Sequence, residues 1–266
     1  MKILVPTDLS DNADQALNFA VSYAQQQCAT ITLIFSYFAV YDFAAEAVRM
    51  AQTIENNAKA ELNKIISKVG RDVEIDFKII QGTVANAIFS TANNDDYDLI
   101  IMGTQGASGI KKNLIGSNTA KVIKESSIPV IAVPFGSSFE SIEKIKVAVD
   151  LQHDKEGIFR KLIKLTETWN LPYEIIHIEN KPNFSKKIIF KGLESYLNEN
   201  FPDCDFSFEM LQEINTDKGL ENYVKNKSDS LLVMFSKDRG FLDFIFKHSH
   251  SVKMVYHTHI PLLVIK

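Results

Sequence analysis

The stretch Asp98–Pro134 reads DLIIMGTQGASGIKKNLIGSNTAKVIKESSIPVIAVP, and Ser230–Lys266 reads SLLVMFSKDRGFLDFIFKHSHSVKMVYHTHIPLLVIK. The two stretches align without a gap. Leu99 falls on Leu231, and the Ile-Pro pair near the end of the first stretch falls on the Ile-Pro pair of the second. Self-similarity at one constant offset is typical of a repeated structural unit. The sequence therefore predicts two copies of one domain.

The beginnings of the two halves match as well. Lys2–Asp8 reads KILVPTD and Lys144–Asp150 reads KIKVAVD, so each half opens with a short apolar run closed by an aspartate. Between the halves, Phe135–Ser138 reads FGSS, which is the small and polar composition of a linker. These patterns predict one domain at residues 1–136 and a second at residues 141–266.

The composition is that of an ordinary globular chain and excludes several classes of protein. The 266 residues are 45% hydrophobic and 23% charged, and the net charge of −4 gives no overall field for nucleic acid or for an anionic membrane. No apolar stretch approaches the ~18 residues of a membrane span, and the start MKILVPTDLS is unlike a signal peptide. Cys28 and Cys204 lie far apart, without metal-type spacing. We therefore expect a cytoplasmic protein without a disulfide framework or a cysteine zinc site.

Apolar runs of strand length alternate with helical patterns along both halves. In the first half, strands are expected at 3–5, 31–35, 73–80, 99–102 and 130–133, and helices after a Ser10-Asp11 cap and at 43–69, 84–93 and 117–126. In the second half, strands are expected near 147–149, 173–178, 206–210, 231–234 and 262–265, with a helix at about 186–200. This alternation predicts an α/β fold with a doubly wound parallel sheet and right-handed crossovers in each half.

The loop after the fourth strand carries the sharpest functional signal, G-x2-G-x9-G-S, formed by Gly103, Gly106 and Gly116-Ser117. Ligands of open α/β sheets bind beyond the carboxyl ends of the strands, where the strand order reverses. Gly103 and Gly106 would let backbone amides approach phosphate oxygens and adopt positive φ. Gly116 would begin a helix whose free N–H groups and dipole favour an anion, with hydroxyl donors from Ser117 and Thr119. The alternative is that these glycines only form turns.

This motif, behind an opening strand that ends in an aspartate, resembles the universal stress protein family. The resemblance covers nearly the whole chain as a tandem pair, and it is stronger in Met1–Pro134 than in Lys144–Lys266. It implies two flavodoxin-like (Rossmann-like) domains, each with a five-stranded parallel sheet of strand order 3-2-1-4-5. It also implies that the fifth strands, 130–133 and 262–265, cover their edges by antiparallel pairing, which makes an intramolecular pseudo-dimer. A further homodimer of two chains is left open.

The resemblance further implies an adenine-nucleotide site in the first half. The expected ligand is ATP, or ADP or AMP, with or without Mg. Asp8 would contact the adenosine, although a carboxylate there also suits the start of a helix. Ser36 would line the adenine pocket, and Asn118 would contribute mainly its backbone. The other expected contacts are Pro6 and Thr7 beside Asp8, Met102, Gly103 and Gly106 along the ribose and phosphates, and Gly116, Ser117 and Thr119 at the phosphate tail.

The second half departs from the glycine motif. At the three glycine positions it carries Phe235, Asp238 and His248, and only Ser249 and Ser251 remain of the anchoring hydroxyls. A phenylalanine blocks close approach of the backbone, and an aspartate repels phosphate. We expect this half to have lost nucleotide binding and to serve as a structural or regulatory partner.

All six histidines also lie in the second half. The pairs His248/His250 and His257/His259 have a spacing that invites a metal hypothesis, because imidazole is the commonest ligand. Residues two apart on a helix point in different directions, however, and His259 precedes the last strand. We therefore expect solvated or packing histidines and no metal site.

The sequence is interpreted as a nucleotide-binding protein of stress response or signalling, in which ATP orders the loop Gly103–Ser117 and biases a surface for an unknown protein partner. An ATP hydrolase fits less well, because the first half has no Walker motif and no histidine; we expect at most weak ATPase activity.

A phosphoacceptor receiver would need an aspartate after the third strand and a lysine after the fifth, where Gln81-Gly82 and Pro134 stand. Lys111-Lys112 could neutralise a phosphate or form a solvated pair. A ligand-free structural dimer module is the remaining alternative.

Overall fold

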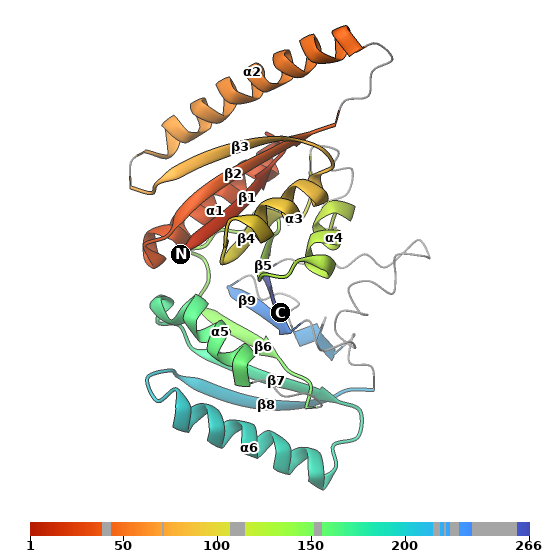
Figure 1. Ribbon diagram of the computed structural model, residues 1–266. Helices are drawn as coiled ribbons and strands as arrows, with labels where there is room; N and C mark the ends of the chain where they lie inside the picture. Colours follow the sequence, from red (N-terminus) through yellow and green to blue (C-terminus); the bar gives the residue numbers. More distant parts are fainter. Residues whose placement is uncertain are drawn as a thin grey trace. The chain divides into compact units, whose positions relative to one another are not determined.

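The computed structural model describes residues 1–38, 44–70, 72–106, 115–151, 156–214, 219–220, 222–223, 229–235 and 260–266 (Figure 1). The chain forms two compact units, Met1–Phe139 and Glu140–Lys266. Strands and helices alternate along the first unit, and the described part of the second unit also contains both.

The first unit is a parallel sheet with the predicted strand order. Its strands are β1 (Lys2–Thr7), β2 (Thr30–Tyr37), β3 (Ile75–Gln81), β4 (Leu99–Gly103) and β5 (Val130–Val133), and its helices are α1 (Asp11–Gln27), α2 (Ala44–Val69), α3 (Val84–Asn94) and α4 (Ser117–Glu125). Hydrogen-bonded neighbours run β3-β2-β1-β4-β5, and all of these pairs are parallel. The doubly wound α/β fold and the order 3-2-1-4-5 are therefore confirmed.

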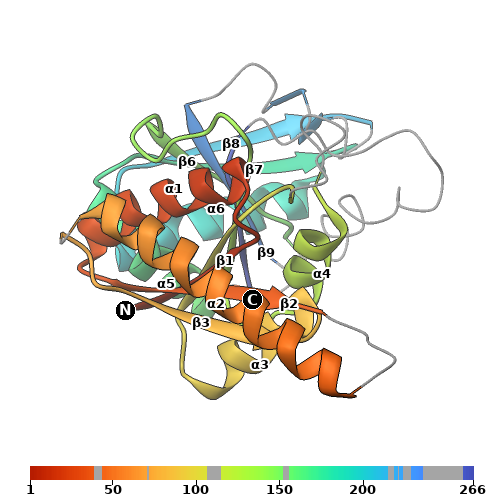
Figure 2. The ribbon, with the colours of Figure 1, turned by 90° about the horizontal axis from the view of Figure 1, so that it is seen from above.

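The central strands of this sheet are covered on both faces, and for that reason they are apolar throughout. The residues Ile3–Pro6 of β1 and all residues of β4 are buried. Helix α1 packs on β1 and β4, and α3 packs on β1 and β2 and lies beside α4 (Figure 1). The long helix α2 packs on the outer strands β2 and β3 (Figure 2). The strand order reverses between β1 and β4. Because the crossovers are right-handed, α1 and α2 therefore cover one face of the sheet and α3 and α4 cover the other.

The segment after β5 is held against α1. The side chain of Gln15 accepts a hydrogen bond from Gly136 N (2.9 Å) and donates one to Ser137 O (2.9 Å). The Phe139 ring packs edge-on against Phe19, with 5.4 Å between the ring centroids. Although its composition is that of a linker, this segment therefore packs as part of the first unit.

The sheet of the second unit has the same strand order as that of the first. Its strands are β6 (Lys144–Ala148), β7 (Tyr173–Glu179), β8 (Phe206–Gln212), β9 (Ser230–Phe235) and β10 (Leu262–Ile265), and its helices are α5 (Glu156–Thr166), the short 3₁₀ helix η1 (Glu167–Trp169) and α6 (Phe184–Asn200). The parallel neighbours run β8-β7-β6-β9-β10, which is again 3-2-1-4-5 along this unit. Helix α6 begins two residues earlier than predicted because the Asn183 side chain caps it, accepting a hydrogen bond from Lys186 N (2.9 Å).

The antiparallel pairing expected between the fifth strands remains a prediction. Within the ranges given above, none of the helices combines the length and the apolar character needed to cross a membrane.

Candidate functional site

A cavity of about 370 Å³ lies in the first unit, where the strand order reverses. It is bounded by the carboxyl ends of β1, β2 and β4 and by the first turns of α3 and α4. Open α/β sheets bind their ligands at this place. The described residues that line the cavity are Pro6, Thr7, Asp8, Ala13, Ile34, Ser36, Val84, Ala87, Ile88, Met102, Gly103, Gln105, Gly106, Gly116, Ser117, Asn118 and Thr119.

Every residue predicted to contact the ligand lines this cavity. The structure thus brings together segments that are far apart in the sequence, while contact with a ligand stays a prediction. The lining residues that sequence reasoning missed are Ala13, Ile34, Val84, Ala87, Ile88 and Gln105. A local signal existed for several of them, because Ile34 shares a strand face with Ser36 and the α3 residues have helical spacing. Only the fold shows that these faces turn toward the glycine loop.

Gly103 and Gly106 serve close packing. Neither residue has a positive φ, so the left-handed conformation expected for both is wrong. A Cβ on Gly103 would lie 2.6 Å from Asn12 Nδ2, and a Cβ on Gly106 would lie 2.7 Å from Asp8 Oδ2. Atoms do not approach one another so closely. A larger residue at Gly103 would displace the Asn12 amide and press on Asn12 O, 3.1 Å away, and one at Gly106 would turn the Asp8 carboxylate away. The two glycines therefore bring both loops of the cavity into contact.

Asp8 follows β1 directly, and the start of α1 holds its carboxylate. Its Oδ1 accepts hydrogen bonds from Ser10 N (3.2 Å) and Ser10 Oγ (2.5 Å). The intervening Leu9 has a φ of 63° and donates its N–H to Thr7 Oγ1 (3.0 Å). A bulky residue at positive φ is an outlier that surrounding contacts must hold in place. This turn places the Asp8 carboxylate in the cavity wall, next to Gly106.

The opposite end of the cavity is the start of α4. Gly116 is the N-cap residue, with a φ of −65°, and it gives the helix no side-chain cap. The first amides of a helix have no partner within the helix, and together with the dipole they attract an anion. Gly116 N donates a hydrogen bond to Thr104 O (2.6 Å), which ties α4 to the loop after β4. The Thr119 hydroxyl, expected at a phosphate, here donates to Gly103 O (2.9 Å) and so joins the strand to the helix.

A third part of the lining is apolar. Ile34 comes from β2, and Val84, Ala87 and Ile88 come from the first turns of α3. Ser36 adds a hydroxyl near the carboxyl end of β2. An apolar wall near an anion-binding helix start suits a ligand with a flat apolar part and an anionic part.

The corresponding edge of the second unit carries a phenylalanine where the first unit has Gly103. Phe235 ends β9 and is completely buried. Its ring packs edge-on against Phe159 of α5, with 5.3 Å between the ring centroids. The ring therefore packs between β9 and α5, at the strand position that Gly103 occupies in the first unit.

The predictions for Lys111-Lys112 and for residues 236–259 lie outside the described residues. They include the departures from the glycine motif after Phe235 and both histidine pairs. His177 is described: it is buried, and its Nδ1 lies 2.8 Å from Val149 O. Among the described residues, no group of three His, Cys, Asp or Glu side chains is arranged to hold a metal ion.

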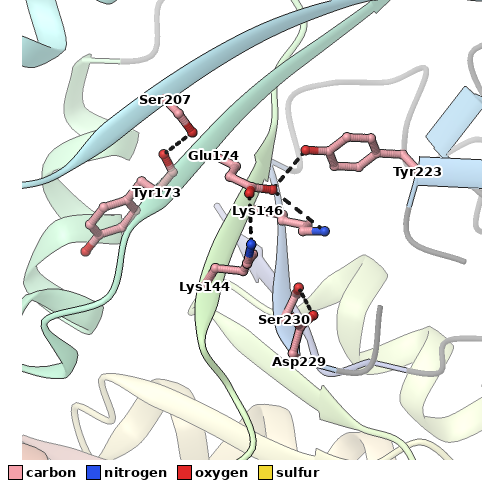
Figure 3. Close-up of polar contacts among 8 residues, drawn as sticks. All are labelled: Lys144, Lys146, Tyr173, Glu174, Ser207, Tyr223, Asp229 and Ser230. Atoms are coloured by element: carbon pink, nitrogen blue, oxygen red, sulfur yellow. Dashed lines mark hydrogen bonds and ion pairs between the residues drawn. The ribbon is translucent and has the colours of Figure 1, made fainter. Parts of the chain in front are cut away.

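A second polar cluster lies toward the amino ends of the strands in the second unit (Figure 3). Lys146 of β6 is only 1% exposed and stands where the repeat has Leu4 in the first unit. Its Nζ lies 3.7 Å from Glu174 Oε2. Glu174 also accepts hydrogen bonds from Tyr223 OH (2.9 Å) and Lys144 Nζ (3.3 Å). The Glu174 carboxylate thus lies opposite the buried Lys146 ammonium.

The fold and the cavity together define a doubly wound α/β protein with a cavity at the switch point of its first unit. Residues 1–134 match the model of the universal stress protein family. The chain is 31% identical over 137 residues to a universal stress protein of Methanocaldococcus jannaschii, covering 50% of this chain and 81% of that protein. It is 30% identical over 135 residues to a universal stress protein of Thermus aquaticus, covering 49% of this chain and 96% of that protein. The chain therefore belongs to the universal stress protein family.

The solved structure of a universal stress protein from Archaeoglobus fulgidus is similar to the chain over its whole length. The TM-score is 0.76 at 16% sequence identity, and the match covers 100% of this chain and 98% of that one. At this identity the likeness shows the fold alone. It supports the tandem α/β arrangement across both halves.

Proposed function

We propose that the first unit binds an adenine nucleotide, ATP above all, and that the protein acts in stress response or signalling through this binding. The observation that carries the proposal is the convergence of the predicted contact residues on one cavity with an anion-binding helix start. Membership of the universal stress protein family supports the stress-response role. Bound ATP would order the loop Gly103–Ser117 and change the surface offered to a protein partner.

The phosphates would lie at the start of α4. Its first amides carry no side-chain cap, and the two glycines after β4 allow the neighbouring backbone to approach closely. The described lining residues include no lysine or arginine, and residues 1–140 hold 11 basic against 15 acidic side chains. Backbone amides and a helix dipole, rather than bulk positive charge, would therefore bind the polyanion.

The adenosine would lie at the other end of the cavity. The apolar wall of Ile34, Val84 and Ile88 suits the face of a base. Asp8 suits a ribose, because a carboxylate accepts hydrogen bonds from hydroxyl groups but repels phosphate. The distribution of charge thus favours one orientation, with the base toward α3 and the phosphates toward α4.

The lining supports binding rather than turnover. Asp8 is the one titratable side chain among the described lining residues, and Ser10 donates a hydrogen bond to its Oδ1. Efficient phosphoryl transfer needs a group that positions the nucleophile and cations that neutralise the developing charge. We therefore expect at most weak release of labelled phosphate from ATP, and rapid turnover would favour the enzyme alternative instead.

Calorimetric titration of the nucleotide-free protein with ATP, ADP and AMP, each with and without Mg, tests the proposal. The decisive variant is Gly116→Asp. A φ of −65° suits an aspartate, which is a favourable N-cap residue, so α4 should be retained with a small shift of Thr104 O, which would lie 3.3 Å from the new Cβ. The new carboxylate would accept hydrogen bonds from the amides that would otherwise bind the phosphates. Its negative charge would also repel the phosphates. We expect the affinity for ATP to fall at least about tenfold, or about 1.4 kcal/mol.

Gly157→Asp is the matched control. Gly157 lies in the first turn of α5 in the second unit, where an added Cβ has no neighbour within 4 Å. This variant adds the same charge to the start of a helix away from the cavity, so ATP affinity should stay unchanged. Unaltered ATP affinity in Gly116→Asp, or a wild-type protein that binds no nucleotide, would favour the ligand-free structural module.

A further inference from the structure

Asn12 is a polar residue in a buried position of α1. It is only 9% exposed, although it lies in the first turn of the helix, next to the exposed Asp11. The residues that follow it along the same helix face, Ala16, Phe19 and Tyr23, are buried and form part of the core. Asn12 thus occupies the end of an apolar stripe, where a small apolar side chain would be the ordinary choice.

The Asn12 side chain contacts the loop after β4 at two points. Its Nδ2 donates a hydrogen bond to the backbone oxygen of Gln105. The same nitrogen lies 2.6 Å from the place where a Cβ on Gly103 would stand, so the missing side chain of Gly103 makes room for it. The amide therefore joins the start of α1 to the segment from Gly103 to Gln105.

Stability alone does not explain an asparagine at this position. Within the described part of the chain, its Oδ1 is buried without a hydrogen-bond partner. A buried carbonyl that has lost its water costs free energy, and an alanine would avoid that cost. The contact that an alanine would lose is the tether to Gln105.

We infer that Asn12 is a positioning residue, which holds the loop after β4 in the shape that receives the phosphates without touching the ligand itself. Asn12 is not among the cavity-lining residues, whereas Gln105 and Gly106 are. The inference rests on the proposed function of the same site, and it deepens it by naming a group outside the cavity that sets the preference for phosphorylated ligands.

The effect should be greatest at the phosphate end of the cavity. Gln105 follows Thr104, whose oxygen accepts the hydrogen bond from Gly116 N (2.6 Å), so the tether acts on the loop that meets the start of α4. The apolar wall belongs to β2 and α3, to which Asn12 Nδ2 makes no hydrogen bond within the described residues. An untethered loop samples more conformations, and ordering it on binding lowers the affinity for a ligand that needs it.

The test compares ATP and adenosine binding to wild-type protein and to Asn12→Ala by calorimetry, together with thermal unfolding. The affinity for ATP should fall about tenfold, as expected for one lost positioning hydrogen bond, while that for adenosine changes less than about twofold. The unfolding midpoint should stay the same or rise. A purely structural role would lower the midpoint and weaken both ligands alike.

Two further variants test whether the lost hydrogen bond to Gln105 causes the effect. Asn12→Leu has a similar size but lacks the N–H donor to Gln105 and adds no charge near the phosphates, so it should fold and show the same selective loss for ATP. Asn18→Ala changes an exposed asparagine of the same helix and should leave both affinities unchanged.

The outcomes separate this inference from the function on which it rests. Wild-type protein that binds neither ligand would overturn the proposed function and the inference with it. Suppose instead that wild-type protein binds both ligands. Unchanged ATP affinity in Asn12→Ala and Asn12→Leu, or an equal loss for both ligands, would then overturn the inference alone.

Discussion

Single residues at the ends of β1 and β4 fit together at contact distance. Asn12 and Asp8, from the loop and helix after β1, lie where side chains on Gly103 and Gly106 would otherwise stand. The hydrogen bond from Thr119 Oγ1 to Gly103 O closes the same region from the side of α4. A larger residue at Gly103 or Gly106 would therefore displace the side chains of Asn12 or Asp8.

Glu174 shows how residues compensate a charge in the core of the second unit (Figure 3). Burial alone would raise the pKa of this carboxyl. The hydrogen bonds from Tyr223 and Lys144 and the charge of Lys146 outweigh burial, so the pKa lies below its ordinary value of 4.5. For Tyr223, burial and the hydrogen bond to Glu174 raise the pKa. The network is therefore held together by an ionised glutamate.

Glu174→Gln should lower the free energy of unfolding by about 3 kcal/mol at neutral pH, because it leaves the buried Lys146 ammonium facing a neutral amide. The folded state binds the Glu174 proton less tightly than the unfolded chain does. The contribution of this carboxylate is therefore present above pH 4.5 and is lost as the pH falls through the lower folded-state pKa. Urea unfolding of wild type and variant over this range should show a difference that shrinks on acidification.

Glu194→Gln is the control for this prediction. Its carboxylate pairs with the exposed Lys191 at 2.7 Å, one helical turn away. Exposed pairs contribute about 0–1 kcal/mol, so this variant should change stability little. A difference between wild type and Glu174→Gln that does not vary with pH would contradict the assignment of the lowered pKa.

Among the elements, α1 links the core of the first unit to its cavity. Its N-cap residue, Ser10, accepts a hydrogen bond from Ala13 N (3.3 Å) through Oγ and donates one from the same atom to Asp8 Oδ1 (2.5 Å). One hydroxyl thus caps the helix and orients the carboxylate in the cavity wall. At its other end, α1 stops at Cys28, which has the left-handed φ of 49° that commonly ends a helix.

Ser10→Ala should therefore reduce both stability and binding. Loss of the cap lowers the free energy of unfolding by about 1 kcal/mol. Loss of the hydrogen bond to Asp8 frees its carboxylate to rotate, so the affinity for ATP and for adenosine should fall together, unlike in Asn12→Ala. Urea unfolding and calorimetry measure the two effects. The control is Ser67→Ala, at an exposed position of α2, which should leave stability and both affinities unchanged. If Ser10→Ala lost stability without losing affinity, only the capping role of Ser10 would be supported.

At the scale of the whole molecule, two units of one fold differ at the end of the fourth strand. The first has Gly103 with an open cavity beside it, and the second has Phe235 packed against Phe159. We propose that the second unit is a degenerate copy without nucleotide binding. Titration of the full chain with ATP should then give a stoichiometry near one nucleotide per chain. Two equivalent sites per chain would contradict this prediction, whatever their affinity.

The architecture could be predicted well because its causes are partly local. Buried parallel strands are apolar throughout and covering helices are apolar on one face, so both leave patterns of short period in the sequence. The start of α6 was placed two residues late because Asn183, its cap, precedes the periodic residues. The order of the strands came from the family resemblance, because pairing between distant strands has no local signature.

By itself, the sequence determined the repeat, the α/β class of both units and the glycine loop, and through the family resemblance eleven of the residues that line the cavity. Only the tertiary structure decided what surrounds that loop: the apolar wall from β2 and α3, the bond from Thr119 to Gly103, and the tether from Asn12 to Gln105. The physical reason is distance along the chain. Spacing within a motif reports backbone geometry, whereas contacts between residues far apart in the sequence exist only once the sheet has folded and brought its loops together.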